Sequence, residues 1–120
     1  MARFLKSPKT KGPARYALGR LPQGEMNQTE AAYGRLLETR KLAGEVLWYR
    51  FEGLKFRLAD NCFYTPDFAV MLADGALEAH EVKGKWEDDA RVKIKVAASL
   101  YPIRFVAVRY AKKAWSLEEF

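Results

Sequence analysis

Cysteine and histidine are nearly absent from the chain. Among 120 residues there is one cysteine, Cys62, and one histidine, His80. A single cysteine cannot form an internal disulfide, and the two residues together supply too few ligands for a structural zinc site or for a metallohydrolase that uses histidine pairs. Long apolar runs are also missing, and the N-terminus lacks the apolar stretch of a signal peptide. We therefore expect a soluble, cytoplasmic protein.

Acidic residues are missing from the first 20 positions, whereas residues 21–120 hold 15 acidic and 15 basic side chains. The net charge of +6 therefore lies entirely in the first segment. Because this segment is rich in Lys, Arg, Pro and Gly and has little periodicity, residues 1–22 are predicted to form a flexible basic N-terminal arm. A polyanion is the expected partner of the arm, with a plain solubilising tail as the alternative. The candidate DNA contacts in the arm are Arg3, Lys6, Lys9, Lys11 and Arg15.

Residues 23–120 are predicted to form one domain. Asn27 and Glu30 have the spacing of a capping box, and Gly44 follows the last helical position, so residues 28–43 are predicted to form a helix. Strands 46–52 and 54–58 are predicted to form a first hairpin, and strands 62–72 and 77–84 a second one. A helix from 87 to about 101 is expected next, followed by a strand at 103–110 that is covered on both faces and by an edge strand in the tail. The pattern indicates an α/β layer fold whose core order is helix, three strands, helix and strand, with a possible extra edge strand.

The second hairpin brings two acids together if its loop has the right length. With a three-residue loop at 73–75, Asp67 lies directly opposite Glu81 on the neighbouring strand, whereas a two-residue loop sends the acids to opposite faces. Directly opposed side chains have Cβ atoms about 4.5 to 5.5 Å apart, so two carboxylates there repel each other unless a cation lies between them. A divalent metal ion is the simplest explanation for the pair.

Lys83 lies on the same face of the strand as Glu81, because strand side chains alternate, while His80 points to the other face and is expected to be structural. Oxygen ligands without a nearby cysteine favour a hard ion, Mg²⁺ or Mn²⁺. A lysine beside such an ion can orient or deprotonate a water molecule, or stabilise charge on a phosphate. Together these residues indicate a phosphodiester hydrolase.

The same residues resemble a known family. Pro66-Asp67, followed after a short hairpin by Glu81-Val82-Lys83, is similar to the PD-(D/E)XK motif of the restriction-endonuclease-like nuclease superfamily. The resemblance covers nearly all of the chain after the arm, and it implies a mixed β-sheet flanked by helices. It also implies that Asp67, Glu81 and the carbonyl of Val82 bind Mg²⁺, with Mn²⁺ as a substitute, and that Lys83 assists the attacking water.

Glu30 narrows the resemblance. It shares a helical face with Tyr33 and Leu37, which is an unusual position for a carboxylate. Small resolvases of the superfamily place a metal-site glutamate on their first helix, and Glu30 matches that position. The chain is thus similar to archaeal-type Holliday junction resolvases and to small phage-borne proteins predicted to be nucleases of that kind. The similarity implies cleavage of branched DNA in a bacterial or phage-infected cell by a homodimer, since a four-way junction needs paired nicks across a two-fold axis.

Other interpretations of these residues stay open. Glu30 can be only half of a capping box, and Glu81 with Lys83 can be a solvated ion pair worth at most about 1 kcal/mol. Lys85 and Lys93 are candidate phosphate contacts, although a solvated helix face also explains charges of this kind. The rival functions are another nuclease of the same fold, acting on flaps, nicks or ends in phage DNA processing, and a non-catalytic DNA-binding accessory protein.

Overall fold

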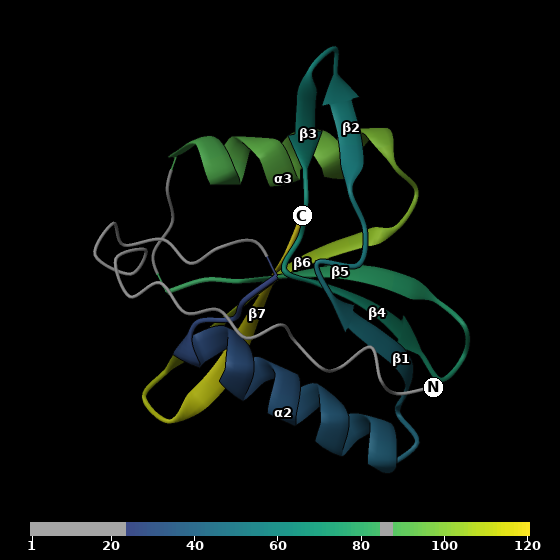
Figure 1. Cartoon of the computed structure of the whole chain (residues 1–120), viewed down its shortest axis with the longest axis vertical. Coiled ribbons are helices and arrows are strands. Elements are labelled where there is room, and N and C mark those ends of the chain that lie inside the picture. Colours follow the sequence, from purple (N-terminus) through teal and green to yellow (C-terminus); the bar gives the residue numbers. More distant parts are fainter. Residues whose placement is uncertain (1–23, 85–87) are drawn as a thin grey trace.

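A computed structural model describes residues 24–84 and 88–120 of the chain (Figure 1). Within these ranges the two helices are α2 (Gln28–Leu42) and α3 (Asp88–Leu100). The strands are β1 (Val46–Phe51), β2 (Phe56–Ala59), β3 (Cys62–Tyr64), β4 (Phe68–Leu72), β5 (Leu77–Val82), β6 (Arg104–Ala111) and β7 (Ala114–Glu119). Neither of the helices in these ranges is long and apolar enough to cross a bilayer.

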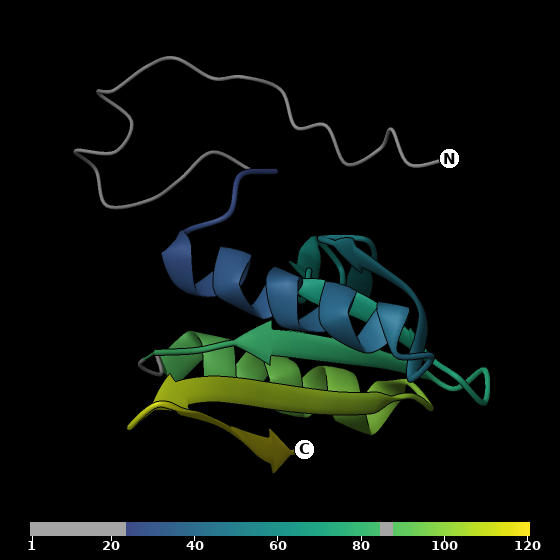
Figure 2. The ribbon, with the colours of Figure 1, turned by 90° about the horizontal axis from the view of Figure 1, so that it is seen from below.

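Five strands form one mixed sheet in the order β1-β4-β5-β6-β7. The β5–β6 pair is parallel and the other three pairs are antiparallel. Helix α3 makes the crossover between the two parallel strands, a connection that a hairpin loop cannot make. In Figure 1 the sheet lies between α3 above and α2 below, and Figure 2, seen from below, shows α2 in front of the sheet and α3 behind it. The expected α/β fold, a mixed sheet flanked by helices, is confirmed.

Helix α2 begins where its capping residues predict. The Asn27 side chain accepts a hydrogen bond from the Glu30 N–H at 2.8 Å, and the Glu30 carboxylate accepts one from the Asn27 N–H at 2.9 Å. The helix ends at Leu42, one residue before the predicted end, and Gly44 follows with a φ of +85°. Local capping thus fixes the position of Glu30 at the start of the helix.

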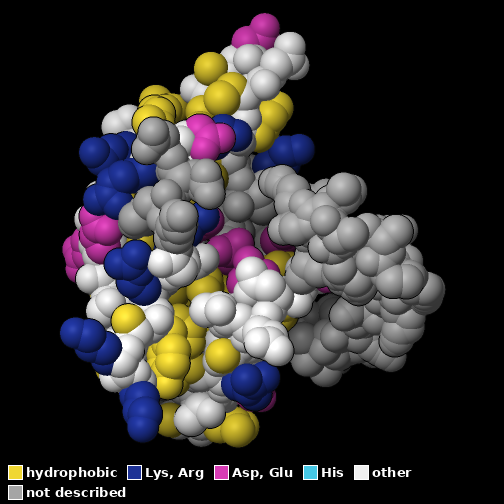
Figure 3. All heavy atoms as spheres, turned by 90° about the vertical axis from the view of Figure 1, so that its left-hand side faces the viewer, with side chains coloured by type: hydrophobic (Ala, Val, Ile, Leu, Met, Phe, Trp, Pro, Cys, Tyr) yellow, Lys and Arg dark blue, Asp and Glu magenta, His cyan; other side chains and the backbone are white. Residues whose placement is uncertain are grey.

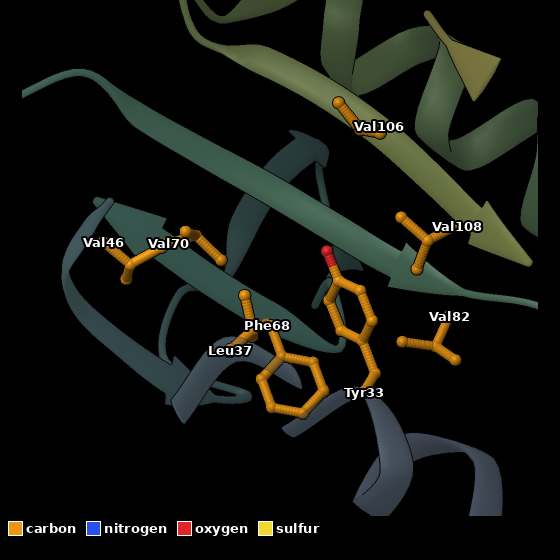
Figure 4. Close-up of a cluster of buried hydrophobic side chains, with 8 residues drawn as sticks. All are labelled: Tyr33, Leu37, Val46, Phe68, Val70, Val82, Val106 and Val108. Carbon is orange, nitrogen blue, oxygen red and sulfur yellow. The ribbon is translucent and has the colours of Figure 1, made fainter. Parts of the chain in front are cut away.

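Each face of the sheet has its own apolar core. The core between α2 and the sheet consists of Tyr33, Leu37, Val46, Phe68, Val70, Val82, Val106 and Val108 (Figure 4). The core on the α3 side consists of Tyr64, Ala79, Ile94, Ala97 and Phe105. Strand β6 contributes Val106 to the first core and Phe105 to the second, which confirms the prediction of a strand covered on both faces.

The first predicted hairpin is wrong. Strand β1 pairs with β4 at the sheet edge, whereas β2 pairs with β3 in a separate two-stranded sheet. Because Phe56 and Leu58 pack with Phe105 on the α3 side, the chain leaves the main sheet after β1 instead of folding back on it. The predicted strand at 62–72 is interrupted near Pro66, since proline has no N–H to donate to a strand ladder. Among the described residues, five strands therefore precede α3, compared with four strand segments predicted from the sequence and three strands in the expected core order.

Candidate active site

A tight loop between β4 and β5 decides which acids face each other. The loop has three residues and ends at Gly75, whose φ is +89°. The Leu72 N–H donates to the Ala76 carbonyl at 2.8 Å, which closes the loop in the predicted register. The ladder keeps this register to its last pair, so Asp67 comes opposite Glu81 at the next position. The hairpin loop therefore has the three-residue length that the sequence analysis required for Asp67 and Glu81 to face each other.

Glu81 lies in β5 with 8% of its surface exposed. Its Oε1 accepts a hydrogen bond from the Tyr64 hydroxyl at 2.7 Å, and its Oε2 lies 3.2 Å from Nζ of Lys83. Burial and the carboxylate of Glu81 raise the pKa of Tyr64, so the hydroxyl stays protonated and remains a donor. The Glu81–Lys83 pair is not solvated, because the two side chains are only 10% and 18% exposed.

Asp67 precedes β4 and faces other acids. Its Oδ2 accepts the backbone N–H of Val82 at 2.8 Å. Burial and then the carboxylates of Glu81 and Glu30 raise the pKa of Asp67 to about 8, against the opposing effect of the Val82 N–H. Without a cation, the Asp67 carboxyl therefore holds a proton at neutral pH.

Glu30 forms its half of the capping box, while its role as a metal ligand stays a prediction. Its carboxylate accepts the Asn27 N–H at 2.9 Å, and its charge also raises the pKa of Asp67. A further acid, Glu52, lies close by, since its N–H donates to the Asp67 carbonyl at 2.7 Å. Burial and, to a smaller extent, the carboxylate of Glu30 raise the pKa of Glu52, against the opposing effect of the Gly24 N–H that its carboxylate accepts at 2.9 Å. The first turn of α2 and the ends of β1 and β5 thus bring four carboxylates into one neighbourhood.

Figure 3 views the molecule from the side at which α2 and α3 begin and β6 turns into β7. Acidic side chains lie near the middle of this face, and others lie at its left border and toward its top, among the Lys and Arg side chains of the border. One of the basic groups at the end of the sheet is Arg109, whose guanidinium donates to the carbonyl of Gly84 at 2.9 Å. This arrangement suits a phosphate chain that approaches an acidic, cation-binding centre.

His80 lies on the opposite face of β5 from Glu81, as predicted. Its Nδ1 is 2.6 Å from the Tyr33 hydroxyl, and its Nε2 is 2.8 Å from Glu78. Glu78 also accepts a hydrogen bond from Arg104 at 2.9 Å. Burial lowers the pKa of His80, so the ring is neutral despite the neighbouring carboxylate. These contacts tie α2 to β5 and β6.

The predicted DNA contacts fall mostly on other parts of the chain. Arg3, Lys6, Lys9, Lys11, Arg15 and Lys85 lie outside the described residues. Lys93 is half-buried in the middle of α3. No hydrogen bond or ion pair in residues 24–84 and 88–120 joins Lys93 to Asp67 or Glu81. Its assignment as a phosphate contact stays a prediction.

The oxygen donors of the site suit a hard divalent cation. Glu30, Asp67 and Glu81 offer carboxylate oxygens of the kind that Mg²⁺ and Mn²⁺ prefer, and a cation would offset the burial and the neighbouring negative charges that raise the pKa of Asp67. Within the described ranges no three acidic, histidine or cysteine side chains already surround one point as in a finished metal site. Tyr64 and Lys83 instead contact the oxygens of Glu81. A cation would therefore displace Lys83 or the Asp67 proton when it binds.

Sequence reasoning missed Tyr64 and Glu52. Tyr64 belongs to the small β2–β3 sheet, which the sequence did not reveal, so no register linked it to Glu81. Glu52 has a φ of 51°, an uncommon conformation for a residue other than glycine. The sequence around Glu52 gives no sign of this conformation.

Comparison of the chain with protein-family models, with curated proteins and with solved structures finds no match. The function is therefore argued from the residues and their geometry.

Proposed function

We propose that the chain is a Mg²⁺-dependent, structure-specific DNA endonuclease of the PD-(D/E)XK class with a restriction-endonuclease-like core. The observation that carries the proposal is the placement of Asp67 opposite Glu81 with Lys83 at 3.2 Å from the Glu81 carboxylate. Acid, acid and lysine at one end of a mixed sheet are the parts that such a nuclease needs. The six basic residues in the first 20 positions favour a nucleic acid as the substrate.

The metal ion of the proposed enzyme would be held by Asp67, Glu81 and the carbonyl of Val82, with Glu30 beside Asp67. Mn²⁺ is expected to substitute for Mg²⁺, because both ions accept carboxylate and carbonyl oxygens. When bound, the ion supplies stabilisation of phosphate charge and a water of lowered pKa. Both effects are needed for hydrolysis of a phosphodiester at neutral pH.

The remaining chemistry belongs to the side chains of the chain itself. Tyr64 fixes the orientation of the Glu81 carboxylate by donating to Oε1 at 2.7 Å, and the Val82 N–H does the same for Asp67 at 2.8 Å. Lys83 then provides the positive charge at the site. As a water molecule attacks phosphorus, the ammonium form of Lys83 stabilises the charge on the phosphate, whereas in the neutral amine form Lys83 would accept the proton of the attacking water.

The proposed substrate is a four-way DNA junction. Resolution of such a junction requires two nicks related by a two-fold axis, so the proposed active form is a homodimer with two separate active sites. Phosphate contacts from basic side chains provide affinity without sequence information. The proposed setting is the cytoplasm of a bacterial or phage-infected cell.

A substrate panel tests the proposal. The full chain is incubated with labelled four-way junction, flap and linear duplex DNA, each in Mg²⁺ and in EDTA. We expect Mg²⁺-dependent cleavage that is fastest on the junction, and loss of this cleavage in Asp67→Ala. The matched control is Asp60→Asn, which changes an acid whose side chain is 93% exposed at the β2–β3 turn.

The outcomes separate the rival functions. Preference for flaps or linear duplex refutes the resolvase assignment and leaves another nuclease of this fold. If neither wild type nor Asp67→Ala cleaves any substrate in Mg²⁺ or Mn²⁺ while both bind DNA equally, catalysis is rejected in favour of an accessory DNA-binding protein.

A further inference from the structure

The turn between β6 and β7 consists of two lysines in a conformation that lysine disfavours. The last pair of the β6–β7 ladder is Ala111 with Ala114, so Lys112 and Lys113 form a two-residue hairpin loop. Their φ angles are 54° and 62°. Positive φ at both positions is the geometry of a type I′ turn, which strongly favours Asn-Gly.

Both lysines are exposed, and within the described part of the chain neither has a hydrogen bond or an ion pair. The residues that flank them in the turn, Ala111 and Ala114, are uncharged. No packing or pairing thus explains why lysine occupies two positions at which asparagine and glycine are less strained. Strain that local contacts do not explain is typical of functional positions.

The turn lies at the same end of the sheet as the candidate active site (Figure 1). In the parallel β5–β6 ladder Glu81 pairs with Ala107, and Lys112 follows Ala107 by five residues. At about 3.3 Å per strand residue, the turn begins ~16 Å along β6 from Ala107, the residue that lies beside Glu81. Arg109 lies between them on the same strand, and its guanidinium already contacts the Gly84 carbonyl.

We propose that the Lys112–Lys113 turn binds the sugar–phosphate backbone of the duplex arm whose scissile phosphate lies at Glu81 and Lys83. A span of ~16 Å corresponds to about five nucleotides along one strand at 3.4 Å each, so the turn contacts phosphates several nucleotides from the cleaved bond. The location of the scissile phosphate rests on the proposed function. The contact itself is electrostatic and independent of base sequence.

A double substitution separates a binding role from a structural one. Lys112→Asn with Lys113→Gly installs the preferred type I′ sequence and removes both charges. If the lysines bind phosphate, this variant is more stable than wild type, with a melting temperature higher by about 4 °C, yet binds DNA more weakly. A purely structural role predicts higher stability with unchanged binding.

Binding is measured by fluorescence anisotropy of a labelled four-way junction and a labelled linear duplex in EDTA, with NaCl varied. Loss of two phosphate contacts should lower affinity at ~0.1 M salt by about tenfold for each lysine and reduce the slope of log affinity against log salt by about 2. Two controls accompany the variant. Lys112→Arg with Lys113→Arg keeps both charges and should bind like wild type, and Lys41→Gln removes one lysine from the far end of α2 and should leave the salt slope nearly unchanged.

An affinity and salt slope of the Asn-Gly variant equal to those of wild type overturn the inference, as does wild type that binds neither probe. Cleavage is scored separately. Wild type that binds both probes but cleaves none in Mg²⁺ refutes the proposed nuclease, while the salt slopes still decide whether the turn contacts DNA.

Discussion

Asp67→Asn should abolish a pH dependence of folding stability that wild type has in cation-free buffer. In the folded chain, burial and the carboxylates of Glu81 and Glu30 raise the pKa of Asp67 from 3.8 to about 8. Between these values the folded state holds a proton that the unfolded state has released. Stability from this group is therefore complete below about pH 4 and is lost as the pH rises toward about 8.

The magnitude follows from the proton difference. One proton held only by the folded state changes the free energy of unfolding by about 1.4 kcal/mol for each pH unit. The largest possible loss of unfolding free energy between about pH 5 and about pH 7 is therefore roughly 3 kcal/mol. Because interacting carboxyl groups do not titrate independently, we expect less than this limit, about 1 to 2 kcal/mol, for wild type. Asparagine keeps an oxygen that can accept the Val82 N–H, but it does not titrate, so the variant should lack this loss.

Urea unfolding followed by tryptophan fluorescence, in EDTA at several pH values, measures the effect. Asp60→Asn serves as the control and should keep the wild-type pH dependence, since its side chain is 93% exposed. If wild type and Asp67→Asn lose stability in parallel between about pH 5 and about pH 7, the acids of the site do not interact as described.

Three further predictions concern the side chains around the acids. Tyr64→Phe removes the donor to Glu81 and should slow junction cleavage by about tenfold in a Mg²⁺ assay, a loss typical of groups that orient a metal ligand; unchanged rates would contradict the role given to its hydroxyl. Tyr33→Phe should lower the free energy of unfolding by about 1 to 3 kcal/mol in urea titrations. The reason is that Nε2 of His80 donates to a carboxylate, which leaves Nδ1 as a buried acceptor that only the Tyr33 hydroxyl satisfies; equal stability would show that water replaces the hydroxyl. Millimolar Mg²⁺ should raise the melting temperature of wild type but not of Asp67→Ala, because an ion that binds only the folded site stabilises it by mass action, and an equal rise in both would place the ion elsewhere.

The sequence predicted the parts of the fold that depend on neighbouring residues. The β4–β5 register follows from the local chemistry of Asp74-Gly75, where glycine adopts positive φ and the Asp74 carboxylate accepts the Ala76 N–H at 2.9 Å. The start of α2 follows from the reciprocal bonds of Asn27 and Glu30. The β4–β5 loop alone was sufficient to place Asp67 opposite Glu81, and the capping box was sufficient to place Glu30 in the first turn of α2.

Features set by distant packing were not predictable in the same way. The apolar residues of β2 fit equally well beside β1 or against α3, and the choice depends on the core around Phe105. For that reason the first hairpin was predicted wrongly and Tyr64 was overlooked as a partner of Glu81. The proximity of Glu30 to Asp67 also depends on how α2 packs on the sheet. In the sequence, the only sign of it was that Glu30 matches, in order along the chain, the first-helix glutamate of small resolvases.

If Glu81 belongs to a metal-dependent phosphodiesterase, its negative charge is needed for catalysis, and the initial rate of junction cleavage by Glu81→Gln in saturating Mg²⁺ measures that need. Glutamine keeps the size of the side chain and an oxygen for the Tyr64 hydroxyl, but it removes the negative charge. We expect Glu81→Gln to cleave at a rate at least about 100-fold below wild type and Asp60→Asn to cleave at the wild-type rate. A Glu81→Gln rate within about twofold of wild type would contradict a metal-dependent role of Glu81.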